Sequence, residues 1–294
     1  MTQLHYQRLN FATGLELDGG KHRDHVHCVR GRGRGSHVGV ATGVATLWIC
    51  LRGQLEVDSA DGPFRLQGRQ FLYFPGTHRA RGVARDAADW MVLSFAPERL
   101  RRTGPGGARR GSASHLYPVA LPMRRQLLRS VVALLRTLEG GGGSSVEIVI
   151  DSLLLDAVDA QAPVNAWLER ACGRSESHRR QVLLRLLSPR NRILNEPFAS
   201  HDLGSLAAAA RYSKSHFLRL FRDVFGQTPH DLLIEARMEL AKDLITGSDM
   251  AIAEVAASVG YESRYAFSRL FKKRVGSTAS DFRQDGAAAM RKAA

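Results

Sequence analysis

The sequence of 294 residues has little cysteine and no long apolar segment. Its three cysteines, Cys28, Cys50 and Cys172, are widely spaced and form no CxxC pair, which argues against a disulfide framework and a zinc module. No stretch approaches the roughly 18 consecutive apolar residues of a transmembrane helix. The N-terminal residues lack the basic start, apolar run and cleavage site of a signal peptide. We therefore expect a soluble protein of the reducing cytoplasm that has no contact with a membrane.

The sequence also lacks the patterns of common catalytic sites. It contains no nucleophile elbow, no HExxH motif and no phosphate-binding loop. Glycine alternates with arginine over residues 31–35, but the lysine and the strand-turn-helix setting of a phosphate loop are missing. We interpret this run as a flexible basic segment. The chain is predicted not to be an enzyme and to need no cofactor.

Acidic residues are scarce relative to basic ones. The chain has 28 Asp and Glu against 42 Lys and Arg, which gives a formal net charge of +14. Such an excess favours polyanionic partners, nucleic acid first among them, although a basic composition also serves solubility alone. The length suits two domains, each with its own core.

Short apolar runs separated by turn residues occupy the region from Thr46 to Phe95. This spacing predicts an antiparallel sandwich or barrel within a first domain, residues 1–115. The predicted strands cover residues 46–51, 54–57, 64–66, 71–74 and 90–95. Residues 99–115 are rich in Gly, Ser and Arg without periodicity, which predicts a loop.

Two amphipathic helices are predicted next, at residues 122–140 and 145–160, with a break at Gly140–Gly143. Each stripe could pack on the chain's own sheet or face a second subunit, so we assign 116–176 as a helical linker that could form a homodimer. The stripes consist of Met123, Leu127, Val131, Leu134, Leu135 and Leu138, and of Val146, Val149, Leu153 and Val158.

An internal repeat of about fifty residues gives the strongest signal in the sequence. Residues 213–229 align without a gap with residues 263–279. The recurring residues are Phe217, Arg219, Leu220, Phe221, Gly226 and Thr228, which match Phe267, Arg269, Leu270, Phe271, Gly276 and Thr278. Upstream, Leu203, Leu206 and Ala207 correspond to Ile252, Val255 and Ala256.

Each copy is predicted to be a helix-turn-helix unit, at about 199–225 and about 249–275, within a helical domain of residues 177–294. A helix from Pro229 to about Thr246 connects the two units. Before them, Ser188 and Pro189 have the residue types of an N-cap and a first helical position, which predicts a short helix that ends at Leu194.

The second helix of each unit is expected to bury its aromatic residues and to expose a basic, polar face. A serine, Ser213 or Ser263, would cap each of these helices. The outward residues are Lys214, Ser215, Leu218, Arg219 and Arg222, and Arg264, Tyr265, Ser268, Arg269 and Lys272. Such a face, near a helix N-terminus, is typical of a recognition helix in a major groove. The alternative is an all-α packing domain with a merely solvated face, which the coinciding repeats of core, turn and charge disfavour.

Residues 188–285 resemble the DNA-binding domain of the AraC family of bacterial regulators. The similarity includes the pattern Gly260-Tyr261-Glu262-Ser263-x-x-x-Phe267-Ser268-Arg269-x-Phe271-Lys272 and the region around Arg237. It implies a sequence-specific transcription regulator that binds double-stranded DNA, with RNA polymerase as a further candidate partner. Ala279 departs from the family, which usually has proline there, and this bears on how a last helix at 280–283 begins.

The resemblance also assigns residues to DNA contacts. Ser215, Leu218, Arg219, Arg264, Tyr265 and Arg269 would face bases, and Ser268 is added from its outward position. The phosphate contacts would come from Ser213, Lys214, Arg222, Ser263, Lys272 and Lys273.

The N-terminal part resembles cupin-like β barrels more loosely, which implies a domain that senses a small-molecule effector. A pocket would be lined by Trp48, Phe71, Tyr73 and Trp90, unless these are ordinary core aromatics. A cupin metalloenzyme is the alternative function, but its candidate ligands lack the expected spacing, so no metal is predicted. These candidates are His25, His27, Glu56 and His78. A third interpretation makes the β domain a structural dimeriser without an effector.

Overall fold

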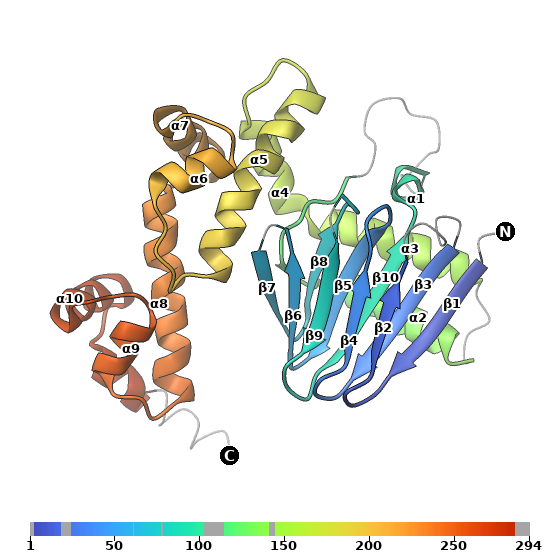
Figure 1. Cartoon of the computed structure of the whole chain (residues 1–294), viewed down its shortest axis with the longest axis horizontal. Helices are drawn as coiled ribbons and strands as arrows, with labels where there is room; N and C mark the ends of the chain where they lie inside the picture. Colours follow the sequence, from blue (N-terminus) through green and yellow to red (C-terminus); the bar gives the residue numbers. More distant parts are fainter. Residues whose placement is uncertain are drawn as a thin grey trace. The chain divides into compact units, whose positions relative to one another are not determined.

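The computed structural model describes residues 3–18, 25–60, 62–77, 79–102, 115–140 and 145–285. The chain divides into two compact units, residues 1–170 and 171–294 (Figure 1). His78, most of the predicted loop at 99–115 and three of the four glycines at the predicted break lie outside the described residues. The two predicted linker helices belong to the same compact unit as the strands.

Two β-sheets form the body of the first unit. The order in one sheet is β1 (Gln3–Leu9), β3 (His25–Arg32), β10 (Asp89–Phe95), β5 (Ala45–Arg52), β8 (Gln70–Phe74) and β11 (Leu121–Pro122). The order in the other is β2 (Gly14–Leu17), β4 (His37–Val40), β9 (Ala80–Ala84), β6 (Gln54–Ser59) and β7 (Gly62–Gln67). The pairs are antiparallel except for β1 with β3 and β2 with β4. All five predicted strands are present, as β5, β6, β7, β8 and β10.

The expected closed barrel is not observed, because no strand pairing among the described residues joins the two sheets. The chain passes from β7 in one sheet to β8 in the other through a tight turn in which Arg69 has a φ of 67°. A left-handed residue at this point turns the chain through a corner, so β7 and β8 end in different sheets instead of extending one ladder. Two layers of strands replace the predicted barrel.

The predicted aromatic pocket is divided between two cores. In the register of β5 with β8, Trp48 pairs with Leu72 and Ile49 pairs with Phe71. Because neighbouring residues of a strand face opposite sides, Phe71 lies on the face opposite Trp48. Trp48 and Trp90 pack between the sheets, whereas Phe71 and Tyr73 pack in the core beneath the helices. All four are at most 4% exposed, so the structure does not bring them together around a cavity.

The Gly-Arg run at 31–35 is an ordered strand end and turn rather than a flexible segment. A Cβ at Gly31 would lie 2.1 Å from the Trp90 ring, so the ring occupies the space that any larger residue would need. Gly33 and Gly35 have φ angles of 87° and 77°, and their amides donate to the carbonyls of Ala88 and Ala84. Close packing and left-handed backbone explain these glycines.

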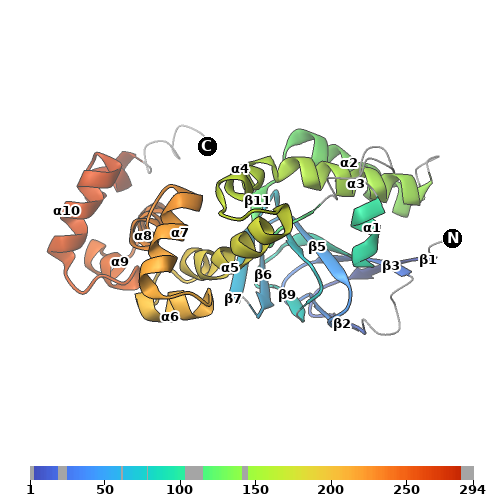
Figure 2. The same ribbon diagram turned by 90° about the horizontal axis from the view of Figure 1, so that it is seen from above.

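Two long helices cover the outer face of the first sheet. They are α2 (Arg125–Leu138) and α3 (Val146–Ala160), which lie side by side in Figure 2. Their apolar stripes belong to the same core as residues of β3, β5, β8 and β10, so the stripes pack on the chain's own sheet. The short helices α1 (Pro97–Arg102) and α4 (Ala162–Arg170) complete the unit, and α1 begins before the predicted loop and extends into it.

A buried arginine ties the end of α2 to the first sheet. Arg30 on β3 has a side chain that is only 9% exposed. Its Nε and Nη2 donate to both carboxylate oxygens of Asp89 at 3.0 and 2.8 Å, and its Nη1 donates to Glu139, the C-cap of α2, at 2.9 Å. These bonds to Asp89 raise the pKa of Arg30 above its ordinary value, so the guanidinium stays charged.

The second unit is helical throughout its described part. Its helices are α5 (Glu176–Asn195), α6 (Leu203–Ala209), α7 (Lys214–Phe225), α8 (Pro229–Gly247), α9 (Ile252–Ser258) and α10 (Arg264–Val275). The prediction that a helix begins at Ser188 is wrong, because α5 starts at Glu176 and continues through Pro189. Buried residues on both sides of Pro189 continue one apolar face, and this packing outweighs the backbone hydrogen bond that proline forfeits.

Arg30→Ala is expected to lower the free energy of unfolding by about 1–3 kcal/mol, because it removes the charged hydrogen bonds to Asp89 and Glu139 and leaves these carboxylates only the exposed Arg32 and Arg8 as partners. Arg79→Ala is the control. Arg79 pairs with Glu16 at 2.8 Å, but both side chains are more than half exposed, so the cost should stay near 0.5 kcal/mol. Urea unfolding of the two variants measures the difference, and equal losses would contradict the structural role of Arg30.

Candidate nucleic-acid interface

Each predicted helix-turn-helix unit is present as two helices joined by a short turn. The first unit consists of α6 and α7, and the second consists of α9 and α10. The predicted caps are confirmed: Ser213 accepts from the amide of His216 at 3.4 Å, and Ser263 accepts from that of Ala266 at 3.3 Å. Each second helix ends at a left-handed glycine, Gly226 or Gly276. The repeat in sequence is therefore a repeat in local structure.

The inner faces of the two units are built alike. Phe217 and Phe221 are fully buried in the first unit, and Phe267 and Phe271 are fully buried in the second. Within each pair the rings contact one another, with centroids 5.4 and 5.6 Å apart. Burial of an aromatic pair fixes the rotation of each helix about its axis, which determines the residues that face solvent.

The outward faces carry the predicted DNA-contacting residues. The exposed residues are Ser213, Lys214, Ser215, Arg219, Arg222, Ser263, Arg264, Tyr265, Arg269, Lys272 and Lys273, while Leu218 and Ser268 are half-buried. Tyr265 is 78% exposed, an unusual position for a large aromatic side chain. Seven of the exposed residues on α7 and α10 named here are Lys or Arg, against one exposed carboxylate, that of Asp223 on α7. The net positive charge of the two faces can therefore attract a polyanion.

Threonine caps the helix that follows each unit. Thr228 and Asp231 form a reciprocal capping box at the start of α8, and the hydrogen bond from Thr228 lowers the pKa of Asp231. The amide of Asp281 donates to the hydroxyl of Thr278 at 3.2 Å, and residues 279–285 are helical. The last helix thus begins in the same way as α8 although Ala279 replaces the usual proline.

Arg237 on α8 contacts both units. Its Nε donates to the carbonyl of Pro197 at 2.9 Å and its Nη2 to that of Ala199 at 3.3 Å, ahead of α6. The guanidinium also lies 5.3 Å from the ring of Tyr261, in the turn between α9 and α10. Arg283 also donates to main-chain carbonyls, those of Ile245 on α8 and of Met250 ahead of α9. Sequence reasoning noted the region around Arg237 but missed Arg283, because carbonyl acceptors leave no side-chain pattern.

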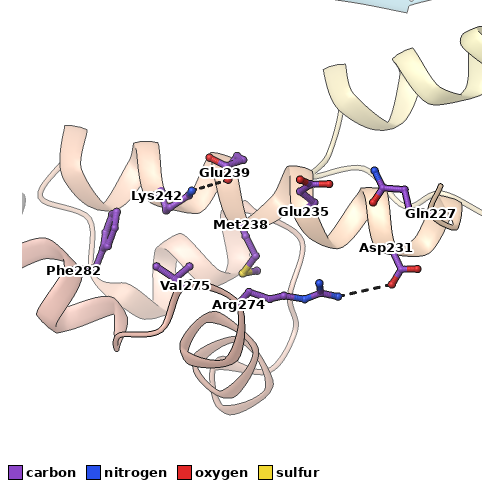
Figure 3. A pocket seen from close by; sticks show the side chains of 9 residues that line it. All are labelled: Gln227, Asp231, Glu235, Met238, Glu239, Lys242, Arg274, Val275 and Phe282. Carbon is purple, nitrogen blue, oxygen red and sulfur yellow. Dashed lines mark hydrogen bonds and ion pairs between the residues drawn. The ribbon is translucent and has the colours of Figure 1, made fainter. Parts of the chain in front are cut away.

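A groove of about 600 Å³ follows α8 within residues 171–294 (Figure 3). Asp231, Glu235 and Glu239 line it at a spacing of four residues, which places them on one face of α8. Nη2 of Arg274 lies 3.8 Å from Oδ1 of Asp231, and Nζ of Lys242 lies 2.6 Å from Oε1 of Glu239. Three carboxylates and two cations thus line the groove, whereas basic residues predominate on the outward faces of α7 and α10.

The candidate metal ligands do not form one described site. His25 and His27 lie on β3 of the first sheet, whereas Glu56 lies on β6 of the second sheet and pairs with Arg85. Burial raises the pKa of the neighbouring Cys28 thiol to about 12, which keeps it protonated. Within the described ranges, no group of three or more His, Cys, Asp and Glu side chains is placed to hold a metal ion. Among the described helices, none combines the length and apolar character that crossing a bilayer requires.

Comparison with known proteins places this geometry in a family. The family described as a helix-turn-helix domain matches residues 206–285. The MmsAB operon regulatory protein of Pseudomonas aeruginosa is 39% identical over 83 residues, which are 28% of this chain and 27% of that protein. The match thus spans little more than a quarter of that relative's length.

Two further proteins are similar to part of the chain. The solved DNA-binding domain of AdpA, in complex with a target DNA, is 31% identical, with a TM-score of 0.34, over 35% of this chain and 94% of that one. Regulatory protein SoxS of Escherichia coli is 35% identical over 82 residues, which are 28% of this chain and 77% of SoxS. The similarity to SoxS and the match to the helix-turn-helix family show that the chain belongs to the AraC family of transcriptional regulators.

Proposed function

We propose that the chain regulates transcription by sequence-specific binding of double-stranded DNA through α7 and α10. One observation carries this proposal: two units with the same core and caps each expose a basic face on the second helix. The 19 residues of α8 span about 28 Å at the helical rise of 1.5 Å per residue. This length is close to the roughly 34 Å between successive major grooves on one side of a duplex. The connector therefore suits simultaneous insertion of both recognition helices.

The proposed contacts divide into two classes. Arg219 and Arg269, with Ser215, Leu218, Arg264, Tyr265 and Ser268, would contact base edges. The phosphate contacts would come from Lys214, Arg222, Lys272 and Lys273, with Ser213 and Ser263 at the helix N-termini. Each serine oxygen already accepts from an amide of its own helix, so its O–H group can still donate to a phosphate beside the amides of the helix N-terminus.

Control of DNA binding by residues 1–170 is a further part of the proposal. A cupin-like domain could couple DNA binding to an effector or to a homodimer, and RNA polymerase would be the partner in transcription. Val132 on α2 and Ile148 on α3 are 44% and 67% exposed, so apolar surface remains outside the core that the two helices form with the sheet. This surface supports a homodimer.

The intact chain should bind duplexes selected from a random-sequence library with an affinity that falls steeply with salt. Four phosphate-bound cations imply a slope of about −3.6 in log K against log salt, so a fourfold rise in salt should weaken binding about 150-fold. Fluorescence anisotropy measures this slope. Selection of no sequence, or a flat salt dependence, would contradict the proposed function.

Arg219→Ala and Arg269→Ala should each reduce discrimination between the selected duplex and random DNA by about 1–3 kcal/mol, because a guanidinium can donate two hydrogen bonds to guanine. Lys214→Ala and Lys272→Ala serve as matched controls, which should weaken binding to both DNAs alike and lower the salt slope by about 1 each. A competition assay measures all four variants. If the arginine variants lose affinity for both DNAs equally, these side chains only hold the backbone.

Static light scattering at micromolar concentration should show a dimer of the intact chain, and Ile148→Glu should shift it toward the monomer because a charge would be buried in the interface. Thr42→Glu, at an exposed turn position outside α2 and α3, is the control for added charge alone. A monomeric wild-type chain would exclude the homodimer.

A further inference from the structure

The recognition helix of the first unit contains an internal contact to its own base-reading arginine. Nη2 of Arg219 lies 3.0 Å from Nδ1 of His216, one helical turn earlier. A guanidinium can only donate hydrogen bonds, so Nδ1 of His216 must accept. The imidazole is then neutral at Nδ1 and carries its proton on Nε2. This contact occupies one of the five N–H groups of Arg219 and leaves enough for two bonds to guanine.

His216 also makes contacts other than the one with Arg219. The main-chain amide of His216 donates to the cap Ser213, and the centroid of its imidazole ring lies 5.1 Å from that of the Tyr212 ring. The guanidinium of Arg185 on α5 lies 5.8 Å from the Tyr212 ring. His216 is half-buried, whereas Arg219 is exposed. A chain of contacts thus connects α5 to the exposed guanidinium through a side chain that has few conformations.

The second helix-turn-helix unit, α9 and α10, lacks this arrangement at the matching position. In the gapless alignment of the repeats, Arg269 corresponds to Arg219 and Ala266 corresponds to His216. A methyl group offers no acceptor, so residue 266 cannot hold the guanidinium of Arg269. The chain therefore contains a natural comparison between an arginine with a holding residue and one without.

We propose that His216 is a positioning residue that fixes the Arg219 guanidinium for base reading, so that the first unit discriminates its base pair more sharply than the second unit does. The inference rests on the proposed role of Arg219 and adds the residue that orients it. An unrestrained arginine loses much rotamer freedom when it binds a base, and a guanidinium ordered in advance loses less. The gain should appear as discrimination between base pairs rather than as general affinity for DNA.

The test uses the intact chain and the duplex that it selects, together with duplexes in which each base pair is replaced in turn. Arg219→Ala identifies the base pair that the first unit reads, and Arg269→Ala identifies that of the second. His216→Ala should lower discrimination at the first base pair about three- to tenfold and leave the second unchanged. His216→Asn keeps an acceptor oxygen near the position of Nδ1 and should restore most of the discrimination. Ala266→His supplies the missing acceptor and should raise discrimination at the second base pair.

The outcomes separate this inference from the proposed function. If the wild-type chain selects a sequence and Arg219→Ala loses discrimination, but His216→Ala retains it, His216 does not position Arg219. If His216→Asn fails like His216→Ala while both melt at the wild-type temperature, the acceptor is not what matters and the inference is wrong. If His216→Ala melts early, Ala266→His decides instead, because absence of a gain at the second base pair then overturns the inference. A chain that selects no sequence contradicts the proposed function itself.

Discussion

The placement of both recognition helices depends on one guanidinium group, that of Arg237. Its carbonyl acceptors fix the chain segment that leads into α6, and its position over Tyr261 fixes the turn that leads into α10. A Cβ at Gly260 would lie 2.8 Å from Nη2 of Arg237, so the turn needs glycine both for this contact and for its φ of 88°. Because α8 carries this arginine between the units, a helix that could be a mere spacer sets their relative orientation. The two helix-turn-helix units are thereby held in one defined relative orientation.

The sequence predicted the helices of residues 171–294 better than the strands of residues 1–170, because the helix-turn-helix pattern occurs twice in the sequence. Phe217 and Phe267 recur in one alignment, and the recurrence separates core from surface without any structure. The error at Pro189 has a definite cause: proline after serine is the pattern of a helix start, and only the buried neighbours Leu186 and Ile193 show that the helix continues. In residues 1–170, β1 to β4, β9 and β11 were not predicted, since strands such as β2 and β9 are short and contain glycine. Phe71 and Trp48 were grouped by residue type, whereas strand register places them on opposite faces.

Charge is distributed unevenly over residues 171–294, and this distribution is more informative than the net charge of +14 of the whole chain. Basic residues gather on the outward faces of α7 and α10, while acidic residues follow α8 along a groove. Burial beside α8 also lowers the pKa of Arg190 on α5 to about 10, although Glu235 opposes the shift. Asp231 and Glu239 pair with Arg274 and Lys242, so the charge in the groove is largely balanced and the excess of positive charge lies on the faces of α7 and α10. Fixed helix rotation, given by the buried phenylalanines, keeps this asymmetry in place.

The tryptophans have a practical consequence that follows from the core of the first unit. Trp48 and Trp90 are fully buried between the sheets with ring centroids 6.5 Å apart, and the third tryptophan of the chain, Trp167, lies on α4. All three belong to residues 1–170. Intrinsic tryptophan emission therefore originates in residues 1–170, and residues 171–294 contribute no tryptophan of their own. Unfolding of the β-rich unit can be followed by its own fluorescence without any added label.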